Sequence, residues 1–419
     1  MPYPIAQLTS EEHLLLSLCR LRFTDSQEEE IKEYVTNISD WDSFVKLSNE
    51  HGIIALSWHN LSELKLTGMI PAEFQEILHK AYFASLSRNT KIFKLLKEVL
   101  KVAEAENIET VLVKGLALES TVYENRGLRQ MNDLDIVVRA GDAIRLRKAL
   151  LKNGFVSQPM ISVLHEKVLP SCGKHLPEMY RYDLAVEIHF KLTDGKGNIL
   201  TEELIKRSVK NPGKIKSTVR NDSQDTPLSA ASASSSGLNE EQQGKTWSFA
   251  TDPQLHFLYL VKHLHKHESG GTSQLRLYAD LVIILAHYGE TILSGDLFEY
   301  AGKAGLEKAL AEKLFLLDNF FGAGIQIPEP AEKEKIIEKF MHYLRHPKDI
   351  KIEDNAESLL KPMRELDGII PKALYMAGYL FPSFTFMRFR YSLSSVFGVL
   401  VHYPVRWWKL VTLIVTGKV

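Results

Sequence analysis

Three short runs rich in β-branched and apolar residues constrain the fold of this chain more than any other feature. The runs "ETVLVKG" (109–115), "DLDIVV" (133–138) and "YDLAVEIHFKL" (182–192) have the composition or the alternation of strands. The segments between them, "LALESTVYEN" and "GDAIRLRKALLKNGF", have helical composition, and Gly154 is placed to end the second helix. Strands that alternate with helices in this order predict a mixed α/β unit about the size of one small domain.

Helical patterns dominate both sides of this unit. The segment "TSEEHLLLSLCRL" opens with Thr9 and Glu12 at the spacing of a capping box, and residues 79–106 carry apolar residues close to a helical stripe. The chain is again helical from "DPQLHFLYLVKHLHKH" to about residue 350. We therefore expect an α+β protein with a helical region at 1–107, a mixed-sheet core at 108–210 and a helical domain at 247–360.

Two further segments differ from these in composition. Residues 211–246 are rich in Ser, Ala, Gly and Gln and have almost no bulky apolar side chains, so we expect a flexible loop or linker. The segment 361–419 is a basic, aromatic tail. From Pro371 to Val419 it holds six Lys or Arg, eleven aromatic residues and neither Asp nor Glu.

Composition bounds the class of protein. A chain of 419 residues can bury the cores of two or three domains, and 45% hydrophobic and 25% charged residues are typical of a folded soluble protein. The net charge of −1 gives no global field that would favour nucleic acid. With only Cys19 and Cys172, a disulfide framework and a cysteine-built zinc site are excluded. The start lacks a signal-peptide pattern and no run of 18 apolar residues occurs, so we expect a cytoplasmic protein.

The stretch "MNDLDIVV" places two carboxylates, Asp133 and Asp135, on one face of a predicted strand, with Leu134 and Ile136 on the other. Adjacent carboxylates repel each other unless a cation lies between them, and a hard divalent ion such as Mg²⁺ meets that need. Glu187 lies within the later strand and is also flanked by apolar residues. If the two strands are neighbours, three carboxylates converge and could hold metal ions for displacement at phosphorus.

Basic residues precede this acidic pair. Lys114 and Gly115 lie where a predicted strand meets a predicted helix. The glycine would let backbone N–H groups approach a phosphate, the helix N-terminus favours an anion, and the lysine adds a point charge. Arg126 and Arg129 follow and are candidates for binding further phosphate oxygens.

Taken in chain order, these motifs resemble the nucleotidyltransferase superfamily that has a DNA polymerase β-like core. More narrowly, they resemble the bacterial family known as uncharacterised nucleotidyltransferase, over about residues 80–290. The motifs that carry the resemblance are Lys114-Gly115, Arg129, Asp133-x-Asp135 followed by Ile-Val-Val, and Glu187-x-His189.

The resemblance implies a polymerase β-like mixed-sheet core flanked by N-terminal and C-terminal helical domains. It also implies metal-dependent transfer of a nucleoside monophosphate from an NTP to an acceptor, with release of pyrophosphate and with Mg²⁺ or Mn²⁺ as cofactor. The broad superfamily signature has a small residue after the glycine, whereas this chain has Leu116. By the resemblance, the catalytic and metal-binding residues are Asp133, Asp135 and Glu187, and the nucleotide-binding residues are Lys114, Gly115 and Arg129.

Other polar residues near these motifs are candidates for a supporting role, which the resemblance favours for His189, His263, His267, Arg276 and Asp280. His263 and His267 share a helix face at i, i+4 and could instead bind zinc in a hydrolase. Arg276 and Asp280 have the spacing of a simple ion pair. Cys172 and His175 are a weak candidate for a nucleophile and its base, in a loop rich in Pro and Gly.

The basic aromatic tail has the composition of an interfacial membrane segment or of a surface that docks a protein partner. The other interpretation is a last helix packed on the body with its aromatic residues buried. The modest density of basic charge and the lack of a recognisable RNA-binding module argue against nucleic acid. A rival function is therefore a non-catalytic scaffold on the same fold that binds a nucleotide or a partner, peripheral to a membrane in glycan biosynthesis.

Overall fold

The computed structural model describes residues 8–193, 199–210, 247–248, 251–348 and 356–416. The predicted linker 211–246 lies outside the described residues. The chain divides into two compact units, which we call the helical unit and the sheet unit. The helical unit comprises Met1–Lys94, Leu112–Asn132 and Lys206–Ile350, and the sheet unit comprises Leu95–Val111, Asp133–Ile205 and Lys351–Val419. The domain boundaries expected from composition stay predictions.

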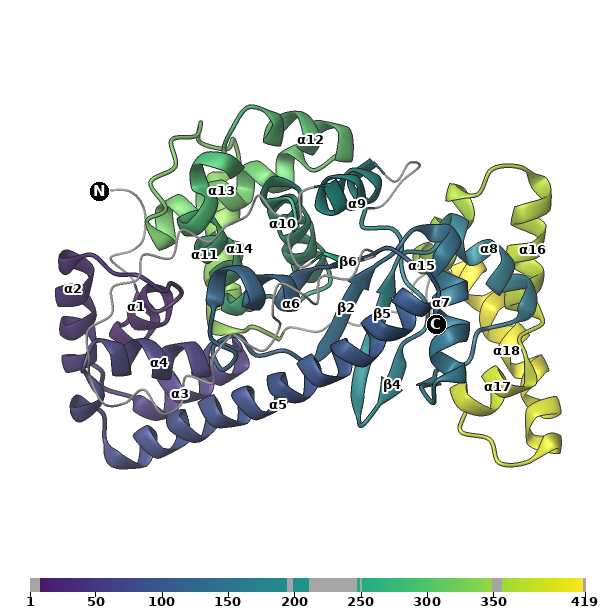
Figure 1. The fold of residues 1–419 in the computed structure, drawn as a ribbon, viewed down its shortest axis with the longest axis horizontal. Coiled ribbons are helices and arrows are strands. Elements are labelled where there is room, and N and C mark those ends of the chain that lie inside the picture. Colours follow the sequence, from purple (N-terminus) through teal and green to yellow (C-terminus); the bar gives the residue numbers. More distant parts are fainter. Residues whose placement is uncertain (1–7, 194–198, 211–246, 249–250, 349–355, 417–419) are drawn as a thin grey trace. The chain divides into compact units, whose positions relative to one another are not determined.

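A mixed sheet forms the centre of the sheet unit. The strand order is β3-β4-β5-β2-β1-β6, and all three predicted strands are among them. Strands β4, β5 and β2 can be followed in Figure 1. The two short strands β3 and β4 are additions that the sequence patterns did not reveal. The strands are β1 (Thr110–Leu112), β2 (Asp133–Val137), β3 (Val156–Ser157), β4 (Met179–Arg181), β5 (Leu184–His189) and the two-residue β6 (Trp247–Ser248).

Strands β2 and β5 are parallel neighbours, as the argument for converging carboxylates required. Their register places Asp135 opposite Glu187 and Val137 opposite His189. On the other face, the apolar residues of both strands are buried: Leu134, Ile136, Val186 and Ile188 are each at most 1% exposed. Because one face is buried in the core, the period of two directs the polar side chains to the opposite face.

Two helices of the sheet unit follow the strands. Helix α7 (Ala140–Lys152) occupies the predicted position, and Gly154 just beyond it has a φ of +83°, a left-handed conformation that suits glycine. Helix α8 (Val163–Cys172) begins at Ser162, whose hydroxyl accepts a hydrogen bond from the backbone N–H of His165. Placing Cys172 in a loop was therefore wrong, because α8 continues through Pro170 and ends at that cysteine.

The described part of the tail is helical and belongs to the sheet unit. Helix α16 packs on α8 (Figure 1), closely enough that a Cβ at Gly378 would lie 2.8 Å from the Ser162 hydroxyl oxygen. Buried Val168 and Cys172 of α8 form a small core with Tyr375 of α16. The tail helices are α15 (Ala356–Glu365), α16 (Ile369–Leu380), α17 (Phe384–Arg390) and α18 (Val396–Thr416).

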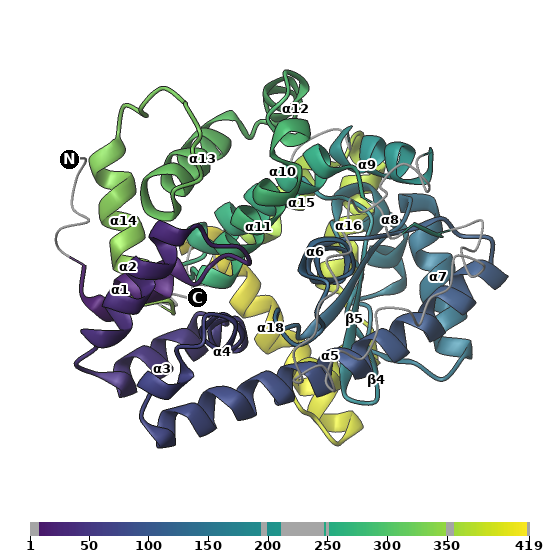
Figure 2. The same ribbon diagram turned by 60° about the vertical axis from the view of Figure 1, so that its left-hand side comes forward.

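The helical unit contains most of the other helices (Figure 2). The capping box predicted for the first helix is confirmed, because the Thr9 hydroxyl accepts from the backbone N–H of Glu12 while the Glu12 carboxylate accepts from that of Thr9. Short helical turns at Thr67–Met69 and Glu119–Tyr123 complete the unit. The helices are α1 (Ser10–Ser17), α2 (Asp25–Thr36), α3 (Trp41–Glu50), α4 (Ile54–Glu63), α6 (Lys114–Leu118), α10 (Pro253–Ser269), α11 (Leu275–Ile292), α12 (Asp296–Ala304), α13 (Glu307–Phe321) and α14 (Lys333–Arg345).

Two helices have residues in both units. Helix α5 (Ala72–Ala105) confirms the helical stripe predicted for residues 79–106, although Phe83 in that stripe is 44% exposed. Helix α9 (Ile199–Lys210) is the second. Each of these helices is continuous, so the units are divided by their contacts and not by breaks in secondary structure.

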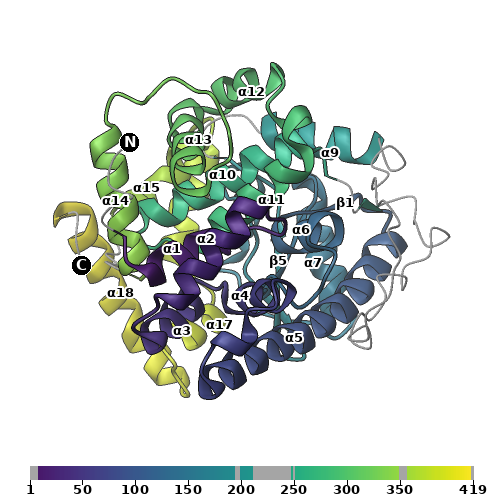
Figure 3. The same ribbon diagram turned by 90° about the vertical axis from the view of Figure 1, so that its left-hand side faces the viewer.

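Helices α10, α11 and α13 pack together in the core of the helical unit (Figure 3). Helix α10 starts with an Asp252 cap followed by Pro253 at its first position, a combination that favours a helix start. Its buried Glu268 accepts hydrogen bonds from Lys313 of α13 and from the Tyr278 hydroxyl of α11. Each buried charge therefore has a partner, as the cost of desolvation demands.

None of the described helices is by itself long and apolar enough to cross a membrane. Helices α11 and α12 together satisfy the length and composition criteria, but they are bent by 112° at the break between them.

Candidate metal and nucleotide sites

A cluster of three potential metal ligands lies on one face of β2 and β5 in the sheet unit. Ligand atoms of Asp135, Glu187 and His189 all lie within 4.8 Å of one another. Asp135 and Glu187 are opposite each other in the parallel register, and His189 follows Glu187 by two residues, so alternation puts all three on the same face. The side chain of Asp135 is 5% exposed and that of Glu187 is 19% exposed, so the cluster is sheltered but open to solvent at Glu187.

His189 lies within the cluster instead of supporting it from outside. Its Nε2 atom is 2.7 Å from Asp135 Oδ1 and 3.1 Å from Glu187 Oε2. An ionised carboxylate only accepts hydrogen bonds, so Nε2 must carry the hydrogen that it shares between the two oxygens. The imidazole therefore holds the two carboxylates together, and it can bind a cation through Nε2 only after losing that hydrogen.

The donor set fits a divalent metal ion. Two carboxylates supply the oxygen ligands that Mg²⁺ requires, and an imidazole nitrogen is also accepted by Mn²⁺ and other transition metals. No other group of three His, Cys, Asp or Glu residues with this spacing occurs among the described residues. The cluster therefore combines the required ligands with the shelter of a sheet face.

Asp133 does not belong to this compact group, although we expected three carboxylates, Asp133, Asp135 and Glu187, to converge. It shares the face of Asp135 but stands opposite Ala185 at the start of β2, where it is half-buried. The residue that completes the compact group is His189, which sequence reasoning placed in a supporting role. The signal was available, because His189 has the same i, i+2 relation to Glu187 that Asp135 has to Asp133.

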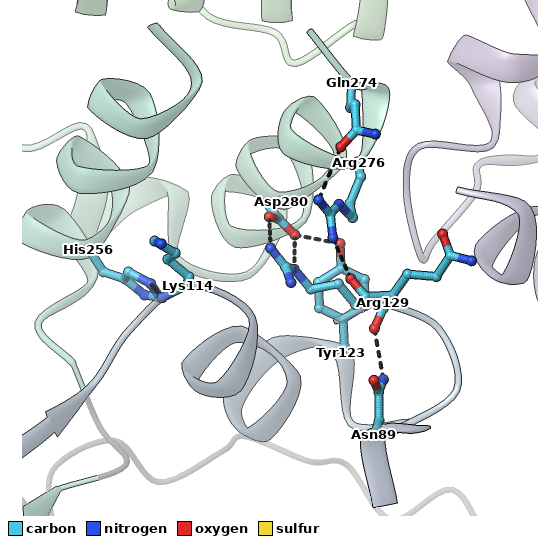
Figure 4. Close-up of polar contacts among 9 residues, drawn as sticks. Asn89, Lys114, Tyr123, Arg129, His256, Gln274, Arg276 and Asp280 are labelled. Atoms are coloured by element: carbon cyan, nitrogen blue, oxygen red, sulfur yellow. Dashed lines mark hydrogen bonds and ion pairs between the residues drawn. The ribbon is translucent and has the colours of Figure 1, made fainter. Parts of the chain in front are cut away.

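In the helical unit, Lys114 forms an unusual turn at the start of α6. It has a φ of +52°, a left-handed conformation that costs energy for a residue with a side chain. Its backbone N–H donates to His256 Nε2 at 3.1 Å (Figure 4). Helix α6 therefore begins at Lys114 itself, one residue before the glycine that was expected to separate strand from helix.

His256 is a residue that sequence reasoning missed. Burial lowers the pKa of its imidazole to about 3, and the charge of Arg129 lowers it further. The ring is therefore neutral at physiological pH, which leaves Nε2 free to accept from the Lys114 N–H and places the ring hydrogen on Nδ1. No local pattern could identify it, since it lies 142 residues from Lys114 in the chain.

Gly115 makes room for an arginine. A Cβ at this position would lie 2.1 Å from Arg129 Nη1. Arg129 is 6% exposed and forms a two-point ion pair with Asp280 of α11, Nε to Oδ1 at 2.8 Å and Nη2 to Oδ2 at 2.7 Å. The Tyr123 hydroxyl donates to the same carboxylate at 2.9 Å (Figure 4). The roles of Gly115 and Arg129 at a nucleotide stay predictions, but the structure gives both residues a structural task.

Arg276 occupies the same region with different partners. Its Nη1 donates to the backbone carbonyl of Gln130 at 2.6 Å, and its Nη2 donates to Gln274 Oε1 at 3.1 Å (Figure 4). Asp280, which was expected to pair with Arg276 at i, i+4, receives the guanidinium of Arg129. The ion pair of Arg129 with Asp280 and the hydrogen bond from Arg276 to Gln130 therefore both hold this loop against helix α11.

The histidines of α10 do not assemble a zinc site within the described residues. The rings of His263 and His267 are 4.6 Å apart, but neither belongs to a group of three potential ligands. His267 lies 3.2 Å through Nδ1 from the Thr272 hydroxyl, and burial lowers its pKa to about 4. These rings therefore contact each other and Thr272, as expected for structural histidines.

Cys172 does not have the properties of a nucleophile. Burial raises the pKa of its thiol to about 11, so the reactive thiolate is scarce at neutral pH. The thiol donates a weak hydrogen bond to the Val168 carbonyl within α8. Its place is in the small core between α8 and α16.

Comparison with known proteins bears on the cluster and on the resemblance. Residues 37–229 match a family model described as uncharacterised nucleotidyltransferase. The match covers 193 of the 419 residues, and over this stretch the chain is similar to that family. Neither a curated protein nor a solved structure matches the chain. The match confirms the predicted family over this stretch and supports a general nucleotidyltransferase function, and therefore an enzyme.

Replacing Gly115 by Ala tests the packing of Arg129. The added methyl group would force the guanidinium away and disturb its buried pair with Asp280, so we expect a loss of about 3–5 kcal/mol in the free energy of unfolding. Urea unfolding followed by circular dichroism measures the loss. Gly141→Ala is the control, because its Cβ meets nothing within 4 Å and Ala favours the helix by about 0.5–1 kcal/mol. Equal unfolding midpoints for the two variants would contradict the packing argument.

Changes at His256 test its neutral, accepting role. His256→Leu leaves the Lys114 N–H without its partner and should cost about 1–3 kcal/mol, whereas the amide oxygen of His256→Gln can replace Nε2 as acceptor. The measurement is the free energy of unfolding of each variant at pH 7. If the Gln variant loses as much as the Leu variant, the hydrogen bond is not what His256 contributes.

The same residue gives a pH dependence with a definite sign. The folded-state pKa of about 3 lies below the ordinary 6.5, so the unfolded state binds the proton more tightly. His256 therefore makes the free energy of unfolding fall as the pH drops from about 6.5 toward 3, by at most about 1.4 kcal/mol per pH unit. His256→Gln should reduce this slope by up to one proton, measured by denaturation from pH 7 to pH 4. An unchanged slope would show that His256 does not titrate in this way.

Proposed function

We propose that this chain is a metal-dependent nucleotidyltransferase that moves a nucleoside monophosphate from an NTP to an acceptor hydroxyl and releases pyrophosphate. The observation that carries the proposal is the register of β2 and β5, which aligns Asp135 with Glu187 and brings His189 between them. The family match supports the general activity. The metal, the leaving group and the residue roles are our inference.

In this proposal Asp135, Glu187 and His189 hold a divalent ion, with Asp133 as an additional carboxylate on the same face. Such an ion, Mg²⁺ or Mn²⁺, supplies Lewis-acid polarisation of the phosphate oxygens and neutralises part of their charge. The protein contributes fixed ligands on two paired strands, so their separation changes little during the reaction. The sheltered face also strengthens the electrostatic interaction between these side chains and the substrate.

The reaction makes and breaks one bond at the α-phosphorus. The acceptor oxygen forms a bond to phosphorus, the bond to the bridging oxygen breaks, and pyrophosphate leaves with that electron pair. The proton of the acceptor hydroxyl must move to a base. Glu187 is our choice, through the carboxylate oxygen that does not bind the ion, because its side chain is 19% exposed against 5% for Asp135 and can pass the proton on to solvent.

Lys114 is our candidate for binding the phosphates of the nucleotide. Its ammonium group is a compact positive charge, and its left-handed backbone is held by His256 instead of by a glycine conformation. Arg129 and Gly115 act in this proposal through packing, because the buried pair with Asp280 supports the turn on which Lys114 lies. In this proposal Arg129 therefore positions Lys114 and does not bind the nucleotide itself.

Asp135→Asn and Glu187→Gln test the metal site. Each variant keeps its size and can still accept from His189, but it loses the charge that binds a cation. We expect Mn²⁺ binding, measured by calorimetry, to weaken by at least about tenfold, a difference of about 1.4 kcal/mol. Pyrophosphate release in the presence of each of the four NTPs should fall with it.

The matched control is Asp183→Asn, which removes an exposed carboxylate just before β5 and keeps a residue that tolerates its φ of +61°. It should leave both readouts unchanged. Full Mn²⁺ binding and full activity in the double variant Asp133→Asn with Asp135→Asn would rule out this mechanism. Failure of the wild-type protein to bind any NTP would favour a non-catalytic scaffold.

His189→Gln tests whether His189 is a metal ligand or only a hydrogen-bond donor to the two carboxylates. A nitrogen ligand contributes more to Mn²⁺ than to the harder Mg²⁺, so its loss should weaken Mn²⁺ binding by a larger factor than Mg²⁺ binding. Calorimetry with each ion gives the two factors. Equal factors would mean that His189 only arranges the carboxylates.

A further inference from the structure

Large apolar side chains are exposed on the tail to a degree that no other described segment matches. Across residues 369–411, thirteen large hydrophobic side chains are at least 37% exposed, against nine in the rest of the described chain. The thirteen are Ile369, Ile370, Phe381, Phe384, Phe389, Val396, Phe397, Leu400, Val401, Val405, Trp407, Trp408 and Val411. Scattered single exposures are ordinary, but a contiguous group marks an interaction surface.

Helix α18 is the centre of this group, and one of its faces is already used. Val399 and Arg406 are buried, and Leu410 on the same face is partly buried against the α8–α16 core. The Arg406 guanidinium donates to the Tyr379 carbonyl at 3.2 Å, and Trp407 Nε1 donates to the Leu380 carbonyl at 2.7 Å. One face of α18 is therefore held against α16 within the sheet unit by these hydrogen bonds.

The opposite face of α18 is also apolar. At about 100° per residue, seven of its exposed side chains lie within an arc of roughly 140° that contains no charged residue, and the exposed Lys409 lies just beyond the edge of that arc. We call this set the α18 stripe: Phe397, Leu400, Val401, Pro404, Val405, Trp408 and Val411. Phe397 is 77% exposed and Trp408 is 74% exposed. A helix that is apolar on both faces needs a second apolar environment beyond the protein core.

The charges of the tail indicate which environment that is. From Pro371 to Val419 the sequence has six Lys or Arg and no acid, and Lys372, Arg388, Arg390 and Lys409 are exposed in the described part. A second copy of the chain would bring the same positive charge to the contact and repel the first. An anionic lipid surface is attractive to each of these cations, while its hydrocarbon boundary takes the apolar side chains and the tryptophans.

We propose that the α18 stripe binds this protein to the surface of a bilayer that contains anionic lipids. The helix would lie in the interface, with the stripe at the level where acyl chains meet head groups and the exposed Lys and Arg at the phosphates. The opposite face keeps its contacts with α16, which is labelled together with α17 and α18 in Figure 1. The proposal is independent of the transferase activity, since it rests on the tail alone.

The test is co-sedimentation of the full chain with vesicles of phosphatidylcholine alone and of phosphatidylcholine mixed with phosphatidylglycerol. We expect binding to the mixed vesicles to exceed binding to the neutral ones by at least about tenfold at low salt, and to weaken as salt is raised. The double variant Leu400→Ser with Trp408→Ser should lose about tenfold or more in binding to the mixed vesicles. Lys409→Gln should lose about fivefold, the effect of one cation near the surface.

Matched controls lie on the helical unit. Phe298→Ser changes an aromatic side chain that is 50% exposed, and Lys335→Gln removes a lysine whose side chain is 77% exposed. Both should bind vesicles as the wild type does, and all variants should retain the wild-type thermal unfolding temperature. Equal binding to the two kinds of vesicle, or wild-type binding by the double variant, would overturn the proposal. So would self-association of the wild type in light scattering that disappears in the double variant without any vesicle binding.

Discussion

The parallel pairing of β2 with β5 is the constraint on which the candidate metal site depends. Asp135 and Glu187 are 52 residues apart in the chain and become neighbours only because the register aligns them. That register is fixed by the buried face, where Leu134 and Ile136 leave no room for a slip by one residue. A slip would send every carboxylate into the core, at a cost of several kcal/mol for each unpaired charge. The buried apolar residues of these strands therefore determine which polar side chains come together on the opposite face.

The helical unit uses a buried ion pair for a comparable purpose. Arg129 and Asp280 are 6% and 0% exposed, and such a pair gains little net stability over an apolar contact but is costly to break. Its two-point geometry, closed by Tyr123, sets the orientation of the loop that returns to β2. Gly115 is needed because the guanidinium lies where a Cβ would be, and Leu116 after it is buried in α6.

Local patterns predicted those features that depend on the period of the chain. Strand alternation correctly placed the carboxylate face of β2 and β5, and helix signals located α1, α5 and α7. Long-range partners were beyond such patterns: His256 meets Lys114 across 142 residues, and no spacing rule connects Arg129 with Asp280. Strands β3 and β4 have two and three residues, too few for alternation to show. The role of His189 stays a prediction, since a histidine beside a carboxylate has no preferred role until its neighbours are known.

The tail differs from the rest of the chain in how it treats apolar surface. Helix α11 is also strongly apolar, and most of its first eleven residues are buried among α10, α13 and the short helical turn Glu119–Tyr123. In the helical unit, neighbouring helices therefore cover an apolar helix almost completely along this stretch. In α18 it covers one face with α16 and leaves the other to solvent, at a cost of about 25 cal/mol for each Å² of apolar surface that water must contact. An apolar face of this kind promotes aggregation unless something covers it, and the residues from Pro371 on, with cations but no acids, favour an anionic surface over a second copy of the chain.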